Sequence, residues 1–190
     1  VPRRWLPLLR RPRRVSRVKG RKTVPGPPLL LNQDAPTLPR LPRAQLRDRI
    51  TQVVAGGNYT IIMTENNRVF ACGGNEQGQL GLGDNTISNT FFTAVPPLPY
   101  DKVAKQVSAG RSHTMILAED GTVFACGYNE YGMLGLDDTT DRNTFTAVEP
   151  LPDGKVVKQV VAGSMHTMIL AEDGTVFACG YNDYGQLGLG

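Results

Sequence analysis

The chain has 190 residues, enough for one domain with a tail, and its net charge of +4 is the sum of two opposite halves. Residues 1–50 contain 14 Arg and Lys against two acids, a net +12, whereas residues 51–190 contain 7 against 15, a net −8. No stretch approaches the roughly eighteen apolar residues of a transmembrane helix, so the sequence predicts no membrane span. This charge asymmetry indicates a basic arm that binds an anionic partner and is attached to an acidic domain.

The first 23 residues are the basic arm. Residues 1–22 carry ten Arg and Lys and no acid, and Pro2, Pro7 and Pro12 prevent a continuous helix there. A mitochondrial transit peptide is also Arg-rich and acid-poor, but it should be amphipathic and Ser-rich, and this arm has one serine. We leave open whether the arm follows a cleaved presequence.

Residues 24–50 read as a linker. The string PGPPLLLNQDAPTLPRLP is rich in proline and is expected to be extended. A short helix is predicted through AQLRDRI, residues 44–50. The folded domain is expected to begin near Thr51.

Residues 51–190 contain an internal repeat. The strings VFACGGNEQGQLGLG, VFACGYNEYGMLGLD and VFACGYNDYGQLGLG begin at Val69, Val123 and Val176, so the period is 54 and then 53 residues. Closely spaced glycines after a strand can cradle a phosphate, but no copy has the lysine and hydroxyl residue of a P-loop. A threefold copy with a fixed period is typical of a repeat architecture, so the loops are interpreted as structural joints.

Each repeat is expected to hold four short antiparallel strands. The first strands are 51–56, 105–110 and 158–163, the second 59–65, 113–119 and 166–172, and the third begins at Arg68, Thr122 and Thr175. Type I′ turns are predicted at 66–67, 120–121 and 173–174, because Asn-Asn and Asp-Gly tolerate positive φ. A fourth strand is predicted near 91–95 and 145–148. Four such strands in about 53 residues match one blade of a β-propeller, which makes the fold class all-β.

At this point the sequence resembles the regulator of chromosome condensation repeat family, whose pattern is Ala-Gly-x-x-His-Thr, a hairpin, and Gly-x-Asn-x-x-Gly-Gln-Leu-Gly. The second copy carries it at Ala109, Gly110, His113, Thr114, Gly127, Asn129, Gly132, Leu134 and Gly135. The third carries it at Ala162, Gly163, His166, Thr167, Gly180, Asn182, Gly185, Gln186, Leu187 and Gly188. The first carries it at Ala55, Gly56, Thr60, Gly73, Asn75, Gly78, Gln79, Leu80 and Gly81, with Tyr59 in place of the histidine.

The chain departs from the family pattern at a few positions. Each copy has a cysteine where the family commonly has Trp, Met133 replaces Gln, and Asp137 replaces the last glycine. Rings of this family have seven blades, and residues 51–190 supply about 2.6 repeats, an incomplete ring. The resemblance implies an interaction scaffold that contacts proteins through its loop faces. It also implies two alternatives: a guanine-nucleotide exchange factor for a Ran-like small GTPase, or a chromatin-associated adaptor.

The candidate catalytic and metal-binding residues are interpreted as structural. His113 and His166 occupy equivalent positions, and a catalytic base would not be exchanged for Tyr59 in a third copy, so packing or backbone hydrogen bonding is expected. The acidic cluster at 136–141 lacks EF-hand spacing and reads as a solvated turn. One cysteine per repeat, without a CxxC pair, argues against zinc and against disulfides. We therefore expect no enzyme activity, no metal and no cofactor, and a reducing compartment, with mitochondrial matrix, nucleus and cytoplasm all open.

The arm is the predicted binding site, with RNA as the expected partner. Its guanidinium groups suit phosphates, and its indole can stack on an unpaired base. The candidate residues are Arg3, Arg4, Trp5, Arg10, Arg11, Arg13, Arg14, Arg17, Lys19, Arg21 and Lys22. Extended basic tails of this kind resemble those of ribosomal proteins, so ribosomal RNA in a large ribonucleoprotein, including a mitochondrial ribosome, is predicted. DNA is the nearest alternative and an acidic protein surface the third.

Overall fold

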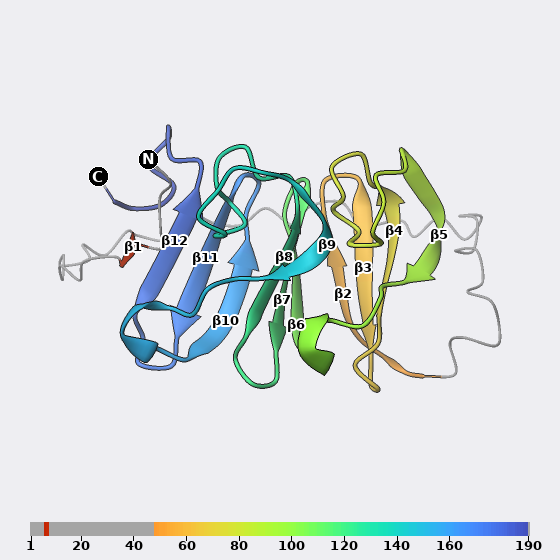
Figure 1. The fold of residues 1–190 in the computed structure, drawn as a ribbon, viewed down its shortest axis with the longest axis horizontal. Helices are drawn as coiled ribbons and strands as arrows, with labels where there is room; N and C mark the ends of the chain where they lie inside the picture. Colours follow the sequence, from red (N-terminus) through yellow and green to blue (C-terminus); the bar gives the residue numbers. More distant parts are fainter. Residues whose placement is uncertain (1–5, 8–47, 190) are drawn as a thin grey trace, which may run out of the picture.

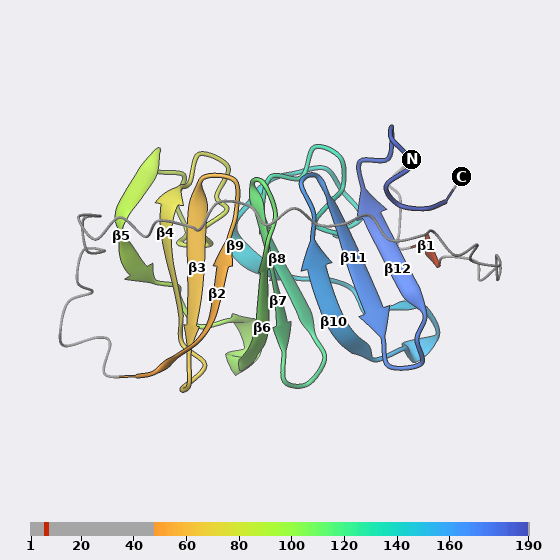
Figure 2. The same ribbon diagram turned by 180° about the vertical axis from the view of Figure 1, so that it is seen from behind.

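A computed structural model describes residues 6–7 and 48–189 of the chain, which form three four-stranded antiparallel sheets. Figures 1 and 2 show the sheets standing side by side in chain order, as blades of a propeller. The all-β propeller architecture predicted from the repeat is confirmed, and the three described blades leave the ring open. Helical structure in these residues is limited to two single 3₁₀ turns, η1 (Pro99–Asp101) and η2 (Pro152–Gly154), which connect successive blades.

The first two blades have the same strand order, from inner to outer strand along the chain. The first consists of β2 (Ile50–Ala55), β3 (Tyr59–Thr64), β4 (Val69–Gly74) and β5 (Ser88–Ala94). The second consists of β6 (Ala104–Ala109), β7 (His113–Ala118), β8 (Val123–Gly127) and β9 (Arg142–Ala147). The outer strands begin about three residues earlier than predicted. The other strands lie within about two residues of the expected bounds.

The third blade takes its outer strand from the other end of the chain. It consists of β10 (Val157–Ala162), β11 (His166–Ala171) and β12 (Val176–Gly180), and β1 (Leu6–Pro7) pairs antiparallel with β12. Leu6 lies opposite Ala178 and Pro7 opposite Phe177. The two described residues of the basic arm thus occupy the place that β5 and β9 hold in the first two blades.

Residues 48–50, the described part of the short helix predicted over 44–50, are not helical. Residues 44–47 lie outside the described residues, and Asp48 and Arg49 are not helical. Ile50 is already the first residue of β2, where it lies opposite Thr64. Pairing with β3 therefore decides the conformation at this position.

The hairpin turns differ from the predicted type I′. Only the second residue of each pair has a positive φ: Asn67 (57°), Gly121 (88°) and Gly174 (83°). The amide of Gly121 donates to the carbonyl of Ala118, and that of Gly174 donates to Ala171. Each hairpin connection is thus a three-residue loop whose last residue adopts the left-handed backbone conformation. Side chains help to set this geometry, because Oδ1 of Asp120 accepts a hydrogen bond from the amide of Thr122 at 3.1 Å.

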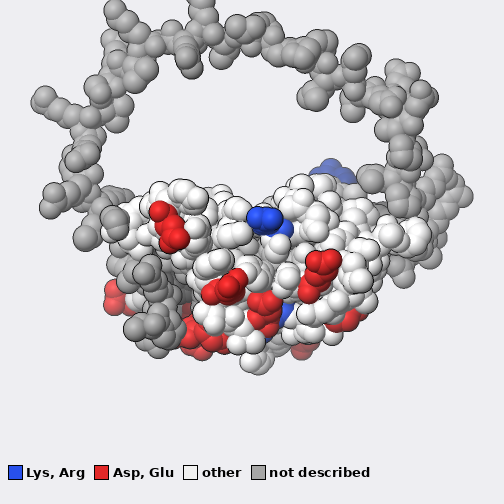
Figure 3. Space-filling view, turned by 90° about the horizontal axis from the view of Figure 1, so that it is seen from above, with Lys and Arg blue, Asp and Glu red and all other residues white. Residues whose placement is uncertain are grey.

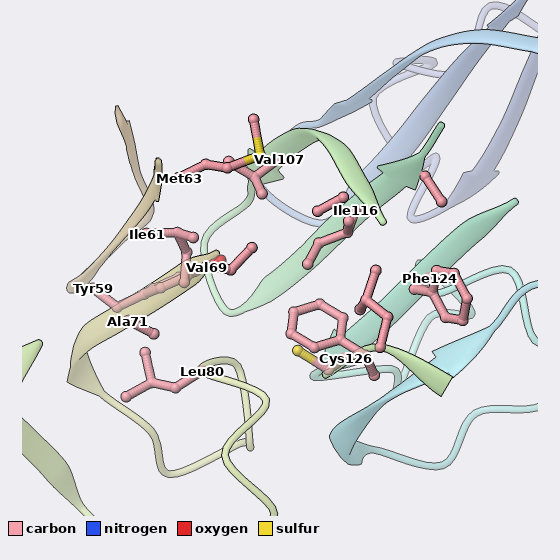
Figure 4. Packing of buried hydrophobic residues seen from close by; sticks show 14 residues of the cluster. Tyr59, Ile61, Met63, Val69, Ala71, Leu80, Val107, Ile116, Phe124 and Cys126 are labelled. Carbon is pink, nitrogen blue, oxygen red and sulfur yellow. The ribbon is translucent and has the colours of Figure 1, made fainter. Parts of the chain in front are cut away.

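The hydrophobic core lies between the blades. Figure 4 shows the cluster shared by the first two blades, in which Ile61 and Leu80 of the first face Val107, Ile116 and Phe124 of the second. A second cluster joins the second and third blades. The side chain of Phe124 is fully buried, and burial of such a side chain contributes about 1.5–3 kcal/mol. Each blade is therefore stabilised mainly by its neighbour.

Candidate functional site

In the first two blades, the first residue of the second strand (Tyr59 of β3 and His113 of β7) reaches across to the next blade. Oη of Tyr59 donates to the carbonyl of His113 at 2.5 Å and lies 3.0 Å from Oγ1 of Thr114. In the next copy, Nε2 of His113 lies 3.0 Å from Oγ1 of Thr167. Tyr59 and His113 thus have the same role: each forms a hydrogen bond with a threonine of the following blade. The expected packing and hydrogen-bonding role of this position is confirmed.

The surroundings of His113 keep its ring neutral. Thr167 donates its hydroxyl proton to the carbonyl of Met133 at 2.8 Å, so it accepts from Nε2, which must carry the proton. Nδ1 is buried without a hydrogen-bond partner. Burial, together with the nearby charge of His166, lowers the pKa of His113 to about 4. A fully buried imidazole of this kind is a structural linker and is poorly placed to exchange protons with a substrate.

The cysteines hold the glycine loop of the preceding blade. Sγ of Cys126 lies 3.6 Å from the carbonyl oxygen of Gln79, which also accepts from Thr114 at 2.6 Å. Sγ of Cys179 lies 3.4 Å from the carbonyl oxygen of Met133 in the same way. Burial raises the pKa of both thiols, so they stay protonated and unreactive. All three cysteines are free thiols.

Glutamine side chains form a second link between blades, which sequence reasoning missed. Nε2 of Gln106 donates to the carbonyl of Val160 at 2.9 Å, and its Oε1 accepts from the amide of Val160 at 3.2 Å. Gln52 makes the same pair of hydrogen bonds to Val107, each 3.0 Å long. A register shift directly precedes each glutamine and re-aims its side chain. The repeated Lys-Gln-Val of the later copies was the available signal.

The glycine loops are joints between blades, as predicted. Asn75 and Asn129 hold them through local backbone: Oδ1 of Asn75 accepts from Leu80 and that of Asn129 from Leu134, each at 3.0 Å. Gly78 has φ of 77°, and a Cβ there would lie 2.5 Å from Cα of Asn143 in the second blade. Its counterpart Gly132 has φ of 74°, and among the described residues the atom nearest to a Cβ there would lie 3.9 Å away. The close approach thus explains Gly78, and the positive φ explains Gly132.

The acidic residues within 136–141 form hydrogen bonds and an ion pair inside the protein. Oδ1 of Asp141 accepts from the amide of Asn129 at 2.8 Å, and Oδ2 of Asp138 pairs with Arg142 at 2.5 Å. Hydrogen bonds from Thr140 and Arg142 lower the pKa of Asp138 against the opposing effect of burial. Within residues 48–189 no group of three or more His, Cys, Asp or Glu is placed to hold a metal ion.

Four tyrosines form a row on the glycine loops, a second feature that sequence reasoning missed. Tyr128 and Tyr131 belong to the second blade, and Tyr181 and Tyr184 belong to the third. Neighbouring ring centroids lie 6.3, 4.9 and 6.1 Å apart, each pair edge to face. The repeated strings GYNEYG and GYNDYG carried the signal. We call these four residues the tyrosine row.

The predicted nucleic-acid-binding residues, Arg3 to Lys22, lie outside the described residues, so their role stays a prediction. Only Leu6 and Pro7 of the arm are described, and they pair with β12. Among the described residues no helix is long and apolar enough to cross a membrane.

Comparison with known proteins places this architecture in a family. The Regulator of chromosome condensation (RCC1) repeat matches residues 50–79, 104–132 and 157–186, and a second description of it matches residues 66–117 and 120–170. The X-linked retinitis pigmentosa GTPase regulator of Canis lupus familiaris is 41% identical over 140 residues, which are 73% of this chain and 14% of that protein. The probable E3 ubiquitin-protein ligase HERC4 of Homo sapiens is 34% identical over 143 residues, 74% of this chain and 13% of that protein.

This chain therefore spans about one seventh of the length of those two relatives. Among solved structures, yeast RCC1 (Prp20), determined with Kap60, has a TM-score of 0.66 at 24% identity, over 75% of this chain and 34% of that one, and shows the fold. Repeat period, blade architecture and sequence agree. The chain belongs to the regulator of chromosome condensation (RCC1) repeat family.

Proposed function

We propose that this chain is a non-catalytic propeller scaffold whose basic arm, residues 1–22, binds RNA within a large ribonucleoprotein such as a ribosome. The observation that carries the proposal is the separation of charge: +12 in residues 1–50 against −8 in residues 51–190. Nucleic acid is attracted by the arm and repelled by the propeller. RNA is therefore expected to contact the arm and to leave the loop faces free for proteins.

The propeller supports the scaffold part of the proposal because its reactive side chains are engaged between blades. His113 is buried against Thr167, and the thiols of Cys126 and Cys179 face backbone carbonyls of the neighbouring blade. These are the residues that sequence patterns single out for catalysis. Their structural use favours a protein that acts by binding.

The test is RNA binding by the full chain and by a variant that lacks residues 1–22, measured across a salt series. A fluorescent single-stranded RNA of about 20 nucleotides, the matching RNA duplex and the matching DNA serve as probes. If six to ten phosphates are neutralised, affinity should fall by about three to five decades between 50 and 200 mM salt. The deletion should abolish this salt dependence. Trp5→Ala should weaken binding to the single strand and leave the duplex unaffected.

Two results would overturn the proposal. Equal affinity with and without residues 1–22 would remove the arm from RNA binding. Tighter binding to DNA than to RNA of the same sequence would favour the chromatin-associated alternative. A matched variant with Arg10, Arg11, Arg13 and Arg14 changed to Lys keeps the charge, so a loss of affinity there would assign the contact to guanidinium geometry.

A regulator of small GTPases is the second candidate function. It is favoured by the 41% identity to a protein named as a GTPase regulator. The test is release of a fluorescent guanine nucleotide from a panel of small GTPases, Ran-like members included, on addition of the chain. Accelerated release from any of them would replace the scaffold proposal by an exchange-factor function.

A further inference from the structure

Two rings of the tyrosine row, Tyr131 and Tyr184, are exposed, and the other two are half-buried. Tyr184 is 88% exposed and Tyr131 is 41% exposed, although both rings touch another ring of the row. Scattered exposed aromatic residues need no explanation, but a contiguous group of them marks an interaction site. The first blade has Gly74 and Gln77 at the equivalent positions, so the row is confined to the second and third blades.

The loops that carry the row are held in place by the fold. Oδ1 of Asn129 accepts from the amide of Leu134 at 3.0 Å, and Oδ1 of Asn182 accepts from Leu187 at 2.9 Å. Leu134 and Leu187 are buried, which anchors each loop to the core. A ligand that binds there meets rings whose backbone is already ordered. Binding therefore carries a smaller entropic penalty than it would on a free loop.

The surroundings of the row are acidic. The loops and turns at this end of the blades (residues 56–58, 75–87, 110–112, 128–141, 163–165 and 181–189) contain seven acids and one base, Arg111. One of the seven acids, Asp138, is paired with Arg142, the first residue of β9. Figure 3 looks onto this end, and among the charged side chains of the described residues it shows more acidic than basic ones. Glu130 and Asp183 directly precede the two most exposed tyrosines of the row, and both are exposed. Ring faces and carboxylates together favour a cation over an anion.

We propose that the tyrosine row, with Glu130 and Asp183, is a docking surface for an extended peptide of a partner protein that carries arginines and prolines. Guanidinium groups stack on aromatic faces and pair with carboxylates, and a proline-rich peptide is extended before it binds and packs on tyrosine rings. The inference concerns the propeller, so it goes beyond the proposed role of the arm and fails or succeeds independently of RNA binding.

The probe is a fluorescent peptide of about twelve residues with alternating Arg and Pro-Pro, and its anisotropy is measured with the full chain. Tyr131→Ala and Tyr184→Ala should each weaken binding about fivefold to tenfold, and Tyr→Phe at either position should retain it, because the ring makes the contact. The matched control is Tyr100→Ala, which removes a tyrosine that is 79% exposed in η1 at the opposite end of the blades. It should leave affinity unchanged within twofold.

Charge alone must be separated from the aromatic contact. Replacement of the peptide arginines by lysines keeps the charge and should weaken binding about threefold to tenfold. Equal affinity of the two peptides, an equal effect of Tyr100→Ala, or no effect of Tyr131→Ala and Tyr184→Ala would overturn the proposal. Because residues 1–22 of this chain also carry Arg and Pro, tighter peptide binding on their deletion would show that the arm occupies the row, which would overturn its assignment to a partner.

Discussion

The Gln106 link between the second and third blades can be tested by Gln106→Ala. The substitution removes two hydrogen bonds, 2.9 and 3.2 Å long, to the backbone of Val160, a residue with 0% exposure. Each buried backbone group that loses its partner costs about 1–3 kcal/mol. Part of that cost is recovered where water reaches the half-buried glutamine site. We therefore expect a loss of about 2–4 kcal/mol in the free energy of unfolding.

The repeat offers a matched control for this prediction. Gln159 occupies the same position in the third blade and is exposed there, and among the described residues no hydrogen bond of its side chain is found. Gln159→Ala makes the same change of strand propensity and should shift stability by less than about 0.5 kcal/mol. Urea unfolding of the full chain, followed by circular dichroism, measures both variants. Equal losses for the two would refute the reasoning, because they would assign the effect to the strand residue and not to the link.

Two further predictions follow from single contacts. Burial lowers the pKa of His113 to about 4 in the folded protein, whereas it is near 6.5 in the unfolded chain. The contribution of His113 to the free energy of unfolding is therefore complete above pH 6.5 and declines as the pH falls toward 4. The expected loss between pH 7 and pH 4.5 is about 2–3 kcal/mol. His113→Tyr, which copies Tyr59, should flatten urea-unfolding stability over that pH range, and an unchanged slope would contradict the assignment. Gly78→Ala should lower the melting temperature far more than Gly185→Ala, because both have positive φ but, among the described residues, only Gly78 approaches another blade. Equal shifts would show that the backbone conformation alone matters.

Most of the fold could be predicted from the sequence because the repeat itself is informative. A position that holds Tyr59, His113 and His166 in three copies cannot need a particular acid–base chemistry, and the structure shows all three at the start of a middle strand. Likewise, an asparagine that recurs in every glycine loop indicates a local role, and Asn75 and Asn129 fulfil it. The alternation of predicted strands and turns then identified each repeat as a propeller blade.

The hairpins show where a local signal was misleading. Asp-Gly accepts the two positive φ values of a type I′ turn, yet the chain uses a longer loop in which only Gly121 is left-handed. Register between the strands decides between the two, and register depends on which side chains face the neighbouring blade. The dipeptide alone carries no information about that choice.

The sequence by itself determined the order of the strands from β2 to β12, the positions of the joints and the opposite charges of arm and propeller, since these depend on residue type and spacing. It did not predict β1, whose pairing with β12 joins the two ends of the chain. Only the tertiary structure decided which repeated residues act between blades. Gln52 and Gln106 each link one blade to the next, and this role depends on packing that brings the glutamine beside the first strand of the following blade. The tyrosine row also emerged only there, because Tyr131 and Tyr181 are fifty residues apart in sequence and meet when two blades pack together.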